Sequence, residues 1–297
     1  MTKTSISNAL WLFSQKQHYQ FFCKHINQAQ SVQNECLMNY IRTNATTEFG
    51  QTHRFADIQS YKDFVRNVPI IENFDNFRPY TEGVALGKPN VLTTEKVLFF
   101  EETSGSTAQS KLIPYTASLK NEFQKAVAVW MCDLNKMQPD CFRGRAYWSL
   151  SPALKKGFYT EGGIPVGIAD DTAYFNPFAA YLLKNIMAVS SSELLKLTDS
   201  KAFYLATLRA LLAQESLSFI SVWSPVFFLQ LDQFLQNHFD EVLKSLKTDK
   251  KRYQNLVFLK NNGFQWHDLF QNLTVLSCWT NAQAALWKPL FFRKTRF

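Results

Sequence analysis

The chain has 297 residues, of which 46% are hydrophobic and 15% aromatic, and its formal net charge is +8. This length allows one large domain or two smaller ones with a sizeable core, and the composition excludes a disordered chain. The positive charge would suit nucleic acid, an anionic membrane or a phosphorylated ligand. Basic residues are dense only at 247–252 and 293–296, however, and neither segment carries a known nucleic-acid motif. We therefore expect no nucleic-acid partner and no membrane partner.

Five cysteines are scattered along the chain without a C-x-x-C pair. An odd and unpatterned count favours free thiols in a reducing compartment, and no cysteine is assigned to a metal. The apolar residues 9–13 lack the length and the cleavage site of a signal peptide. These features predict a cytoplasmic protein.

The first predicted element is a long helix, because apolar residues recur at steps of three and four between Tyr19 and Tyr40. Gly50 is expected to terminate this element. The following stretch, residues 55–89, is predicted to consist of short pieces and turns, since prolines interrupt it repeatedly.

Residues 103–116 form a stretch rich in hydroxyl groups between two short apolar runs, 97–100 and 112–113. Both runs have strand character, so the predicted order is strand, loop, strand. Such a loop can direct several backbone N–H groups and hydroxyls toward one point, which suits a polyphosphate. Lys111 would add a positive charge on a flexible stem.

A Walker loop is the obvious alternative for this stretch, and the sequence argues against it. That motif needs two glycines and must lead directly into a helix. Here Gly105 is the only glycine of the loop, and Pro114 follows Lys111 too closely for a helix to continue. On composition alone, a plain surface turn rich in Ser and Thr remains the other interpretation.

After this loop, Thr116 is predicted to cap a helix whose N-terminus lies near enough to favour an anion in the loop. The inward face of that helix is expected to contain Leu119, Phe123, Ala126, Val127 and Trp130. A strand is predicted at 146–150. Because open α/β sheets bind ligands at the carboxyl ends of their strands, Ser151 becomes a candidate wall of a site, with a plain turn as the alternative.

The second half of the chain alternates helix and strand. The glycine-rich stretch 157–167 can be a hairpin, a mobile lid or a loop against substrate. Two helices are predicted within 177–213 and strands at 217–223 and 273–279, with Ser224 as an N-cap and Pro225 as the first residue of the next helix. We therefore predict an α/β fold with a mainly parallel or mixed sheet flanked by helices, carried as one domain over residues 1–297.

The stretch 103–116 resembles the nucleotide-binding signature of the auxin-responsive promoter family, the Gretchen-Hagen-type acyl-acid amido synthetases, which belong with the adenylate-forming enzymes. Other short motifs stand in the family's order and at about its spacings, so that the resemblance spans nearly the whole chain. These motifs are Thr47-Glu48-Phe49-Gly50, Val68-Pro69-Ile70, Phe77-Arg78-Pro79-Tyr80, Ser151-Pro152 and Ser277-Cys278-Trp279.

The resemblance implies a reaction in two steps. A carboxylate attacks the α-phosphate of ATP to give an acyl-adenylate and pyrophosphate, and the amine of an amino acid then displaces AMP. Mg²⁺ is implied on the phosphates, and no side-chain nucleophile is needed, so no catalytic residue is assigned. The implied phosphate contacts are Ser104, Gly105, Ser106, Thr107 and Lys111. The implied walls of the acid pocket are Ser151, Trp223 and Ser224, although Trp223 and Phe227 can equally be core aromatics.

Beyond Trp279 the chain departs from the family pattern. The family's later Tyr-x-x-Thr-Glu-Gly motif, its ribose-binding acidic residue and its C-terminal domain are not found in this sequence. We expect an incomplete N-terminal adenylation domain that needs a second polypeptide or self-associates. Exposed apolar surface is expected at Trp287, Leu290, Phe291, Phe292 and Phe297.

Two other function classes stay open at this point. The chain can be a non-catalytic relative that binds a nucleotide or an acid, or a fragment that needs a partner chain. The third and least favoured reading is a nucleic-acid-binding protein driven by its positive charge.

Overall fold

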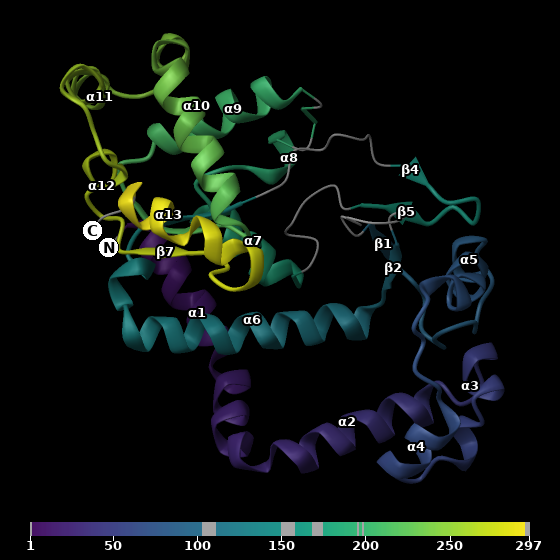
Figure 1. Cartoon of the computed structure of the whole chain (residues 1–297). Helices are drawn as coiled ribbons and strands as arrows, with labels where there is room; N and C mark the ends of the chain where they lie inside the picture. The colour runs from purple at the N-terminus through teal and green to yellow at the C-terminus, as the bar shows by residue number, and fades with distance from the viewer. Residues whose placement is uncertain are drawn as a thin grey trace. The chain divides into compact units, whose positions relative to one another are not determined.

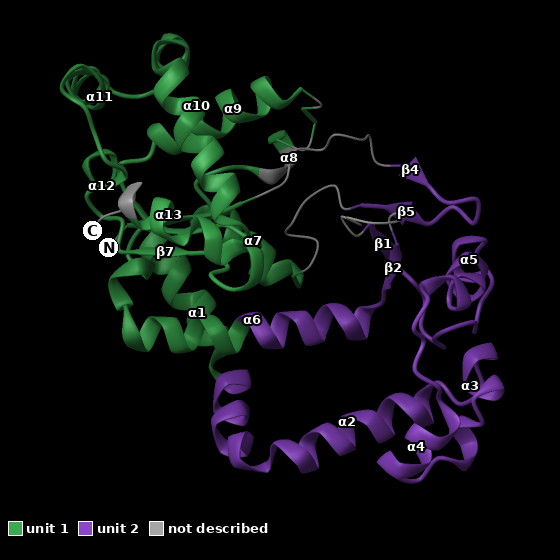
Figure 2. Cartoon of the chain, viewed as in Figure 1, with its two compact units in different colours: residues 1–16, 128–156, 169–297 green, residues 17–127, 157–168 purple. Residues whose placement is uncertain are grey.

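The structure of the chain is a computed structural model that describes residues 2–102, 111–149, 158–167, 175–194, 196, 197 and 199–294. The chain divides into two compact units (Figures 1 and 2). Unit 1 is made of residues 1–16, 128–156 and 169–297, and unit 2 of residues 17–127 and 157–168. Each unit has its own sheet, and a single adenylation domain over residues 1–297 stays a prediction.

Helices dominate both units. The α-helices are α1 (Lys3–His25), α2 (Ala29–Thr43), α3 (Glu48–Thr52), α4 (Tyr61–Asn67), α5 (Arg78–Ala85), α6 (Ala117–Met137), α7 (Pro177–Ile186), α8 (Ser191–Leu194), α9 (Ser200–Leu212), α10 (Pro225–Lys244), α11 (Lys250–Asn262), α12 (Trp266–Leu269) and α13 (Lys288–Lys294). The short 3-10 helices are η1 (Ile26–Gln28), η2 (Phe55–Asp57), η3 (Phe74–Asn76), η4 (Pro139–Phe142) and η6 (Ala282–Trp287). Within the part of the chain that the structure describes, no helix has the length and apolar character that a membrane crossing requires.

The strands form two separate sheets. They are β1 (Phe99–Glu102), β2 (Leu112–Tyr115), β3 (Arg145–Trp148), β4 (Phe158–Tyr159), β5 (Pro165–Val166), β6 (Leu217–Ser221) and β7 (Val275–Ser277). In unit 1 the order is β3-β6-β7, and in unit 2 it is β2-β1-β5-β4.

The sheet of unit 1 is entirely parallel, and its strands lie where the sequence predicts them. In register, Trp148 pairs with Ser221, which in turn pairs with Ser277. The central strand β6 is buried over its first four residues, as expected for an apolar strand covered on both faces. Helices α9 and α10 contribute to the core beside it, which includes Phe203, Leu208, Leu211, Ile220, Phe228, Leu231 and Leu235.

The start of α10 confirms the prediction made from the Ser-Pro pair. The hydroxyl oxygen of Ser224 accepts a hydrogen bond from the backbone N–H of Val226 at 3.2 Å, and Pro225 is the first helical residue. The helix continues beyond His238, where the backbone departs from helical values.

A buried arginine ties three helices of unit 1 together. Arg252 in α11 is only 5% exposed. Its guanidinium donates to the carbonyl oxygen of Leu212, the last residue of α9, at 3.1 Å, and to that of Leu269, the last residue of α12, at 2.8 Å. These carbonyls have no partner within their own helices, so the arginine supplies donors that the helix ends lack.

The sheet of unit 2 is mixed. Strand β1 pairs antiparallel with β2 and parallel with β5, and β5 pairs antiparallel with β4. The described part of the glycine-rich stretch, residues 158–167, is therefore a hairpin, the first of its three predicted alternatives. With one parallel sheet, one mixed sheet and helices around them, the predicted fold class is confirmed (Figure 1).

The turn of the β4–β5 hairpin lies against the C-terminal end of α5. The backbone N–H of Gly162 donates to the carbonyl oxygen of Ala85 at 2.9 Å. A Cβ atom on Gly162 would lie 2.3 Å from the backbone nitrogen of Gly87, so only glycine fits this close approach.

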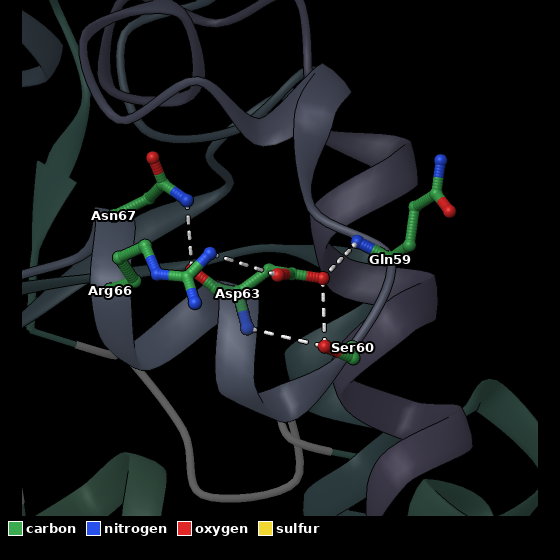
Figure 3. A network of polar contacts seen from close by, with 5 residues as sticks. All are labelled: Gln59, Ser60, Asp63, Arg66 and Asn67. Atoms are coloured by element: carbon green, nitrogen blue, oxygen red, sulfur yellow. Dashed lines mark hydrogen bonds and ion pairs between the residues drawn. The ribbon is translucent and has the colours of Figure 1, made fainter.

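Helix α4 begins with a polar network centred on Asp63 (Figure 3). The Ser60 hydroxyl donates to Asp63 Oδ2 at 2.7 Å and accepts from the Asp63 backbone N–H at 3.2 Å, while the Gln59 N–H donates to the same carboxylate at 3.3 Å. Arg66 Nη1 lies 3.7 Å from Asp63 Oδ1. These contacts, the Ser60 hydrogen bond first among them, lower the pKa of Asp63.

Two expectations for the first helices are wrong. The predicted long helix is interrupted by η1 between α1 and α2, and α2 ends at Thr43. Gly50 does not terminate it but lies inside α3, where its N–H donates to the hydroxyl of the N-cap residue Thr47 at 3.0 Å. A Cβ atom on Gly50 would lie 2.1 Å from the Asn44 carbonyl oxygen, so close packing explains this glycine.

Two burial expectations also need correction. In α6, Ala126 and Trp130 are exposed, whereas Ala128 and Met131 are fully buried. Phe291, expected on the surface, is 2% exposed. Its ring lies 5.3 Å from that of Phe228 in α10, so α13 contributes to the core of unit 1. The other tail residues expected to be exposed are so, namely Trp287, Leu290 and Phe292, while Phe297 lies outside the described residues.

Candidate functional site

The hydroxyl-rich loop is closed by an antiparallel strand pair. Glu102 at the end of β1 pairs with Leu112 at the start of β2, which places their Cα atoms about 5 Å apart. The loop therefore connects two strands, as predicted, and no helix follows it in the manner of a Walker motif. Its residues 103–110, which include the predicted contacts Ser104, Gly105, Ser106 and Thr107, lie outside the described residues.

Lys111 is the one predicted phosphate contact whose surroundings the structure describes. It is exposed and directly precedes β2, at the point where the loop closes. Its ammonium nitrogen lies 4.8 Å from the centroid of the Phe74 ring, within the range of a cation–π interaction.

Phe74 belongs to an aromatic cluster that unites two of the family-like motifs. Its ring centroid lies 5.9 Å from that of Phe77, and the Phe77 centroid lies 5.8 Å from that of Phe49. Phe49 also contacts Tyr80, with 5.1 Å between centroids. The motifs at 47–50 and 77–80 thus pack against each other in unit 2.

The N-terminus of α6 is occupied by a carboxylate of the chain itself. Thr116 caps the helix as predicted, its hydroxyl accepting from the Leu119 N–H at 3.2 Å. Glu95 accepts from the backbone N–H of Ser118 at 3.1 Å and from the Ser118 hydroxyl. These hydrogen bonds, that of the hydroxyl first, hold the pKa of Glu95 below its ordinary value, against the effect of burial.

The prediction that this helix end favours an anion in the loop stays a prediction, because residues 103–110 lie outside the described residues. Strand β2 runs from the loop to α6, so its four residues place Thr116 about 13 Å from Leu112. The helix dipole acts within about one turn, and Glu95 already occupies that position.

The carboxyl edge of the parallel sheet forms a second candidate site, in unit 1. Trp223 follows β6 and Trp279 follows β7, and their rings make an edge contact with 5.4 Å between centroids. The two side chains are 61% and 58% exposed, which excludes a core role for Trp223. Phe227, in contrast, packs partly against the core. The hydroxyl of Ser149 accepts from the Trp223 N–H at 3.3 Å and so joins β3 to this edge.

Of the other two predicted acid-pocket residues, Ser224 lies at the same edge and uses its hydroxyl to cap α10. Ser151 lies outside the described residues.

Sequence reasoning missed an aromatic pair near this edge. Trp148, the last residue of β3, packs against Trp11 of α1, with 6.0 Å between ring centroids. The indole N–H groups of both are buried and find no acceptor among the residues that the structure describes. Trp148 could have been selected as the end of a predicted strand. Nothing local in the sequence joins Trp11 to it, because the two residues lie far apart in the chain.

Ionisable groups give no sign of a metal centre or an activated thiol in the described ranges. There, no three His, Cys, Asp or Glu side chains are arranged to hold a metal ion. Burial raises the pKa of the Cys141 thiol to about 12 and also raises that of Cys278, so neither thiol is prepared as a nucleophile.

Comparisons with known proteins agree on one family. The GH3 family N-terminal domain matches residues 18–258. Among solved structures, the AtGH3.15 acyl acid amido synthetase in complex with 2,4-DB matches with a TM-score of 0.75 and 17% identity over 93% of this chain and 52% of that chain. Another structure of the GH3.15 acyl acid amido synthetase matches with a TM-score of 0.67 and 16% identity, over 90% of this chain and 50% of that chain.

A comparison with curated protein sequences gave no match. The chain spans about half the length of the two solved relatives, and the likeness to them shows a shared fold. The domain match covers far more than half of the chain and agrees with the motifs that the sequence resembles. The chain belongs to the GH3 family, in the region of its N-terminal domain.

Proposed function

We propose that this chain acts in an ATP-dependent ligase that joins a small carboxylic acid to an amino acid through an acyl-adenylate. The observation that carries the proposal is the closed β1–β2 hairpin. It presents a family-like loop between Glu102 and Leu112, with Lys111 where the loop closes. A cytoplasmic location, where ATP is available, is part of the proposal, as is the need for a second polypeptide or for self-association.

On this proposal the loop holds the phosphates of ATP. The hydroxyls of Ser104, Ser106 and Thr107 and the backbone N–H of Gly105 donate to phosphate oxygens, and Lys111 adds a full positive charge. Such contacts position the α-phosphate for the acid and stabilise the charge on the departing pyrophosphate. The amine of the amino acid then displaces AMP.

The chemistry of the hairpin is compatible with Mg²⁺ on the phosphates. Magnesium in nucleotide sites is commonly held by one or two carboxylates together with phosphate oxygens and water. Glu101 and Glu102, at the end of β1, are the carboxylates that this hairpin offers next to the loop. When bound, the ion would neutralise phosphate charge.

The carboxyl edge of the parallel sheet in unit 1 is our candidate binding site for the carboxylic acid substrate. Parallel sheets bind ligands at this edge, and here it exposes Trp223 and Trp279 as apolar walls beside the hydroxyl of Ser149. Ser224 and Ser151 complete the proposed set. Exposed aromatic walls with a few polar groups suit a small organic acid.

Pyrophosphate exchange into ATP tests the proposal. The purified chain is incubated with Mg²⁺, ATP, labelled pyrophosphate and a panel of carboxylic acids, and exchange that depends on the acid is expected. Lys111→Met should lower kcat/KM for ATP by about ten- to hundredfold, since loss of one charge-assisted contact costs about 1.5–3 kcal/mol. Lys62→Met, which removes an exposed lysine of α4, is the matched control and should leave exchange unchanged.

Three outcomes decide between the function classes. Exchange followed by amide formation with added amino acids supports the complete ligase. ATP binding without exchange for any acid points to a non-catalytic nucleotide-binding relative or to a fragment that needs a partner chain. Equal ATP affinity in the wild type and in Lys111→Met removes the loop from the site and refutes the proposal.

A further inference from the structure

Lys111 has an aromatic neighbour that the established family motifs do not account for. The lysine ammonium lies 4.8 Å from the centre of the Phe74 ring, and both residues belong to unit 2. We infer that Phe74 is a positioning residue: its ring holds the Lys111 ammonium at the base of the β1–β2 loop. The inference rests on the proposed function, in which Lys111 contacts ATP phosphates.

The ring of Phe74 is itself fixed from two sides. In η3, the side-chain oxygen of Asn73 accepts from the Asp75 N–H at 3.0 Å, which holds the turn that begins with Phe74. Arg78 donates to the Asp75 carboxylate at 2.7 Å and so joins this turn to α5. On the other side the ring packs against Phe77. A side chain held in this way can orient a flexible one.

An uncharged aromatic ring suits this positioning role. The four-carbon stem of a lysine side chain is flexible because its single bonds rotate. Restricting these rotations before a ligand arrives lowers the conformational entropy lost on binding. The face of an aromatic ring attracts the cation without cancelling its charge, so an anion can still bind it.

The test is a double-mutant cycle read by the affinity for MgATP. Phe74→Leu removes the ring, Phe74→Tyr keeps an aromatic face, and each is combined with Lys111→Met in the 297-residue chain. The dissociation constants are measured by calorimetry. An exposed phenylalanine of unit 2, Phe22, provides the control variant Phe22→Leu.

We expect Phe74→Leu to weaken MgATP binding about two- to fivefold, the size of one exposed cation–π contact. Phe74→Tyr should bind as the wild type does, and Phe22→Leu should have no effect. In the Lys111→Met background, Phe74→Leu should cause no further loss, because the lysine through which it acts is gone. The melting temperatures of the Phe74 variants should stay within about 2 °C of the wild type.

Each contrary result has its own meaning. If Lys111→Met weakens binding and Phe74→Leu does not, or if Phe74→Leu tightens it, the inference is wrong and the proposed function stands. An equal loss from Phe74→Leu with and without Lys111 shows that Phe74 acts by another route, which also overturns the inference. If Lys111→Met itself binds MgATP normally, the proposed function fails, and the inference fails with it.

Discussion

Replacing Arg252 with methionine should strongly destabilise unit 1. The side chain is 5% exposed and provides two hydrogen bonds to the carbonyl oxygens of Leu212 and Leu269. Methionine fills much of the same volume but donates nothing, so both carbonyls lose their partner. A buried acceptor left in this way costs about 1–3 kcal/mol, and the bonds lost are charge-assisted. We expect the free energy of unfolding to fall by about 3–5 kcal/mol.

Urea denaturation followed by tryptophan fluorescence and circular dichroism measures this change. Trp266, buried in the same core, makes fluorescence a direct reporter of unit 1. A loss of about 3 kcal/mol corresponds to a melting temperature lower by about 6–12 °C for a unit of this size. Arg252→Lys keeps the charge and should lose less than Arg252→Met. The neighbouring Lys251 is exposed, so Lys251→Met should change stability by less than about 0.5 kcal/mol.

Comparable stability of Arg252→Met and Lys251→Met would refute this reasoning. It would mean that water or a shift of the helix ends satisfies both carbonyls at no net cost. A fall in denaturant slope without a fall in midpoint would instead indicate a change in the denatured state.

Two further predictions concern unit 2. Gly162→Ala would place a Cβ atom 2.3 Å from the backbone of Gly87, so we expect a loss of about 1–3 kcal/mol, and wild-type stability by thermal denaturation would contradict the close approach. Asp63 has a lowered pKa in the folded state, so its carboxylate stabilises the protein above the pKa of the unfolded chain and this contribution disappears as the pH falls through the folded value. Asp63→Asn should therefore be less stable than the wild type at pH 7, and the difference should disappear as the pH falls through the lowered folded-state pKa of Asp63. A difference that persists unchanged in acid would show that the charge of Asp63 is not the cause.

Local patterns in the sequence were sufficient for much of the fold. The Ser224-Pro225 pair fixes the start of α10 because a hydroxyl cap and a proline without an N–H are both suited to that position. The strand–loop–strand order around residues 103–110 followed from apolar runs that a proline closes. In both cases the determining contacts lie within a few residues of one another.

Errors arose where distant residues decide the structure. In the sequence Gly50 resembles a helix terminator. In the structure it lies inside α3, and its close approach to the Asn44 carbonyl oxygen explains why a glycine stands there. The sequence alone could not select one of three structures for residues 158–167, because the hairpin is joined to its sheet by the pairing of Val166 with the distant Phe100. The buried position of Phe291 depends on a ring contact with Phe228, which no local periodicity contains.

The candidate site was predictable only in part, because its local motifs can be found in the sequence and its long-range contacts cannot. Residue types and family-like motifs were sufficient to predict the phosphate loop and the strand ends as candidate sites. Whether a tryptophan belongs to the core or to a surface site depends on its burial, which the sequence does not show. Trp223 was compatible with a core or a surface position until its exposure was known. Phe74 carried no motif of its own, and only its contact with Lys111 draws attention to it.

The central position of β1 in its sheet has a consequence for the order of folding. Its partner β2 follows within the same hairpin, so this pair closes a short loop and can form early. Its other partner, β5, is synthesised only after the chain has passed through residues 128–156, which belong to unit 1. During translation, therefore, unit 2 presents one unpaired edge of β1 until the β4–β5 hairpin emerges. A ribosome that pauses before residue 157 would hold a nascent chain with an exposed strand edge, which is a site for chaperone binding or misassembly.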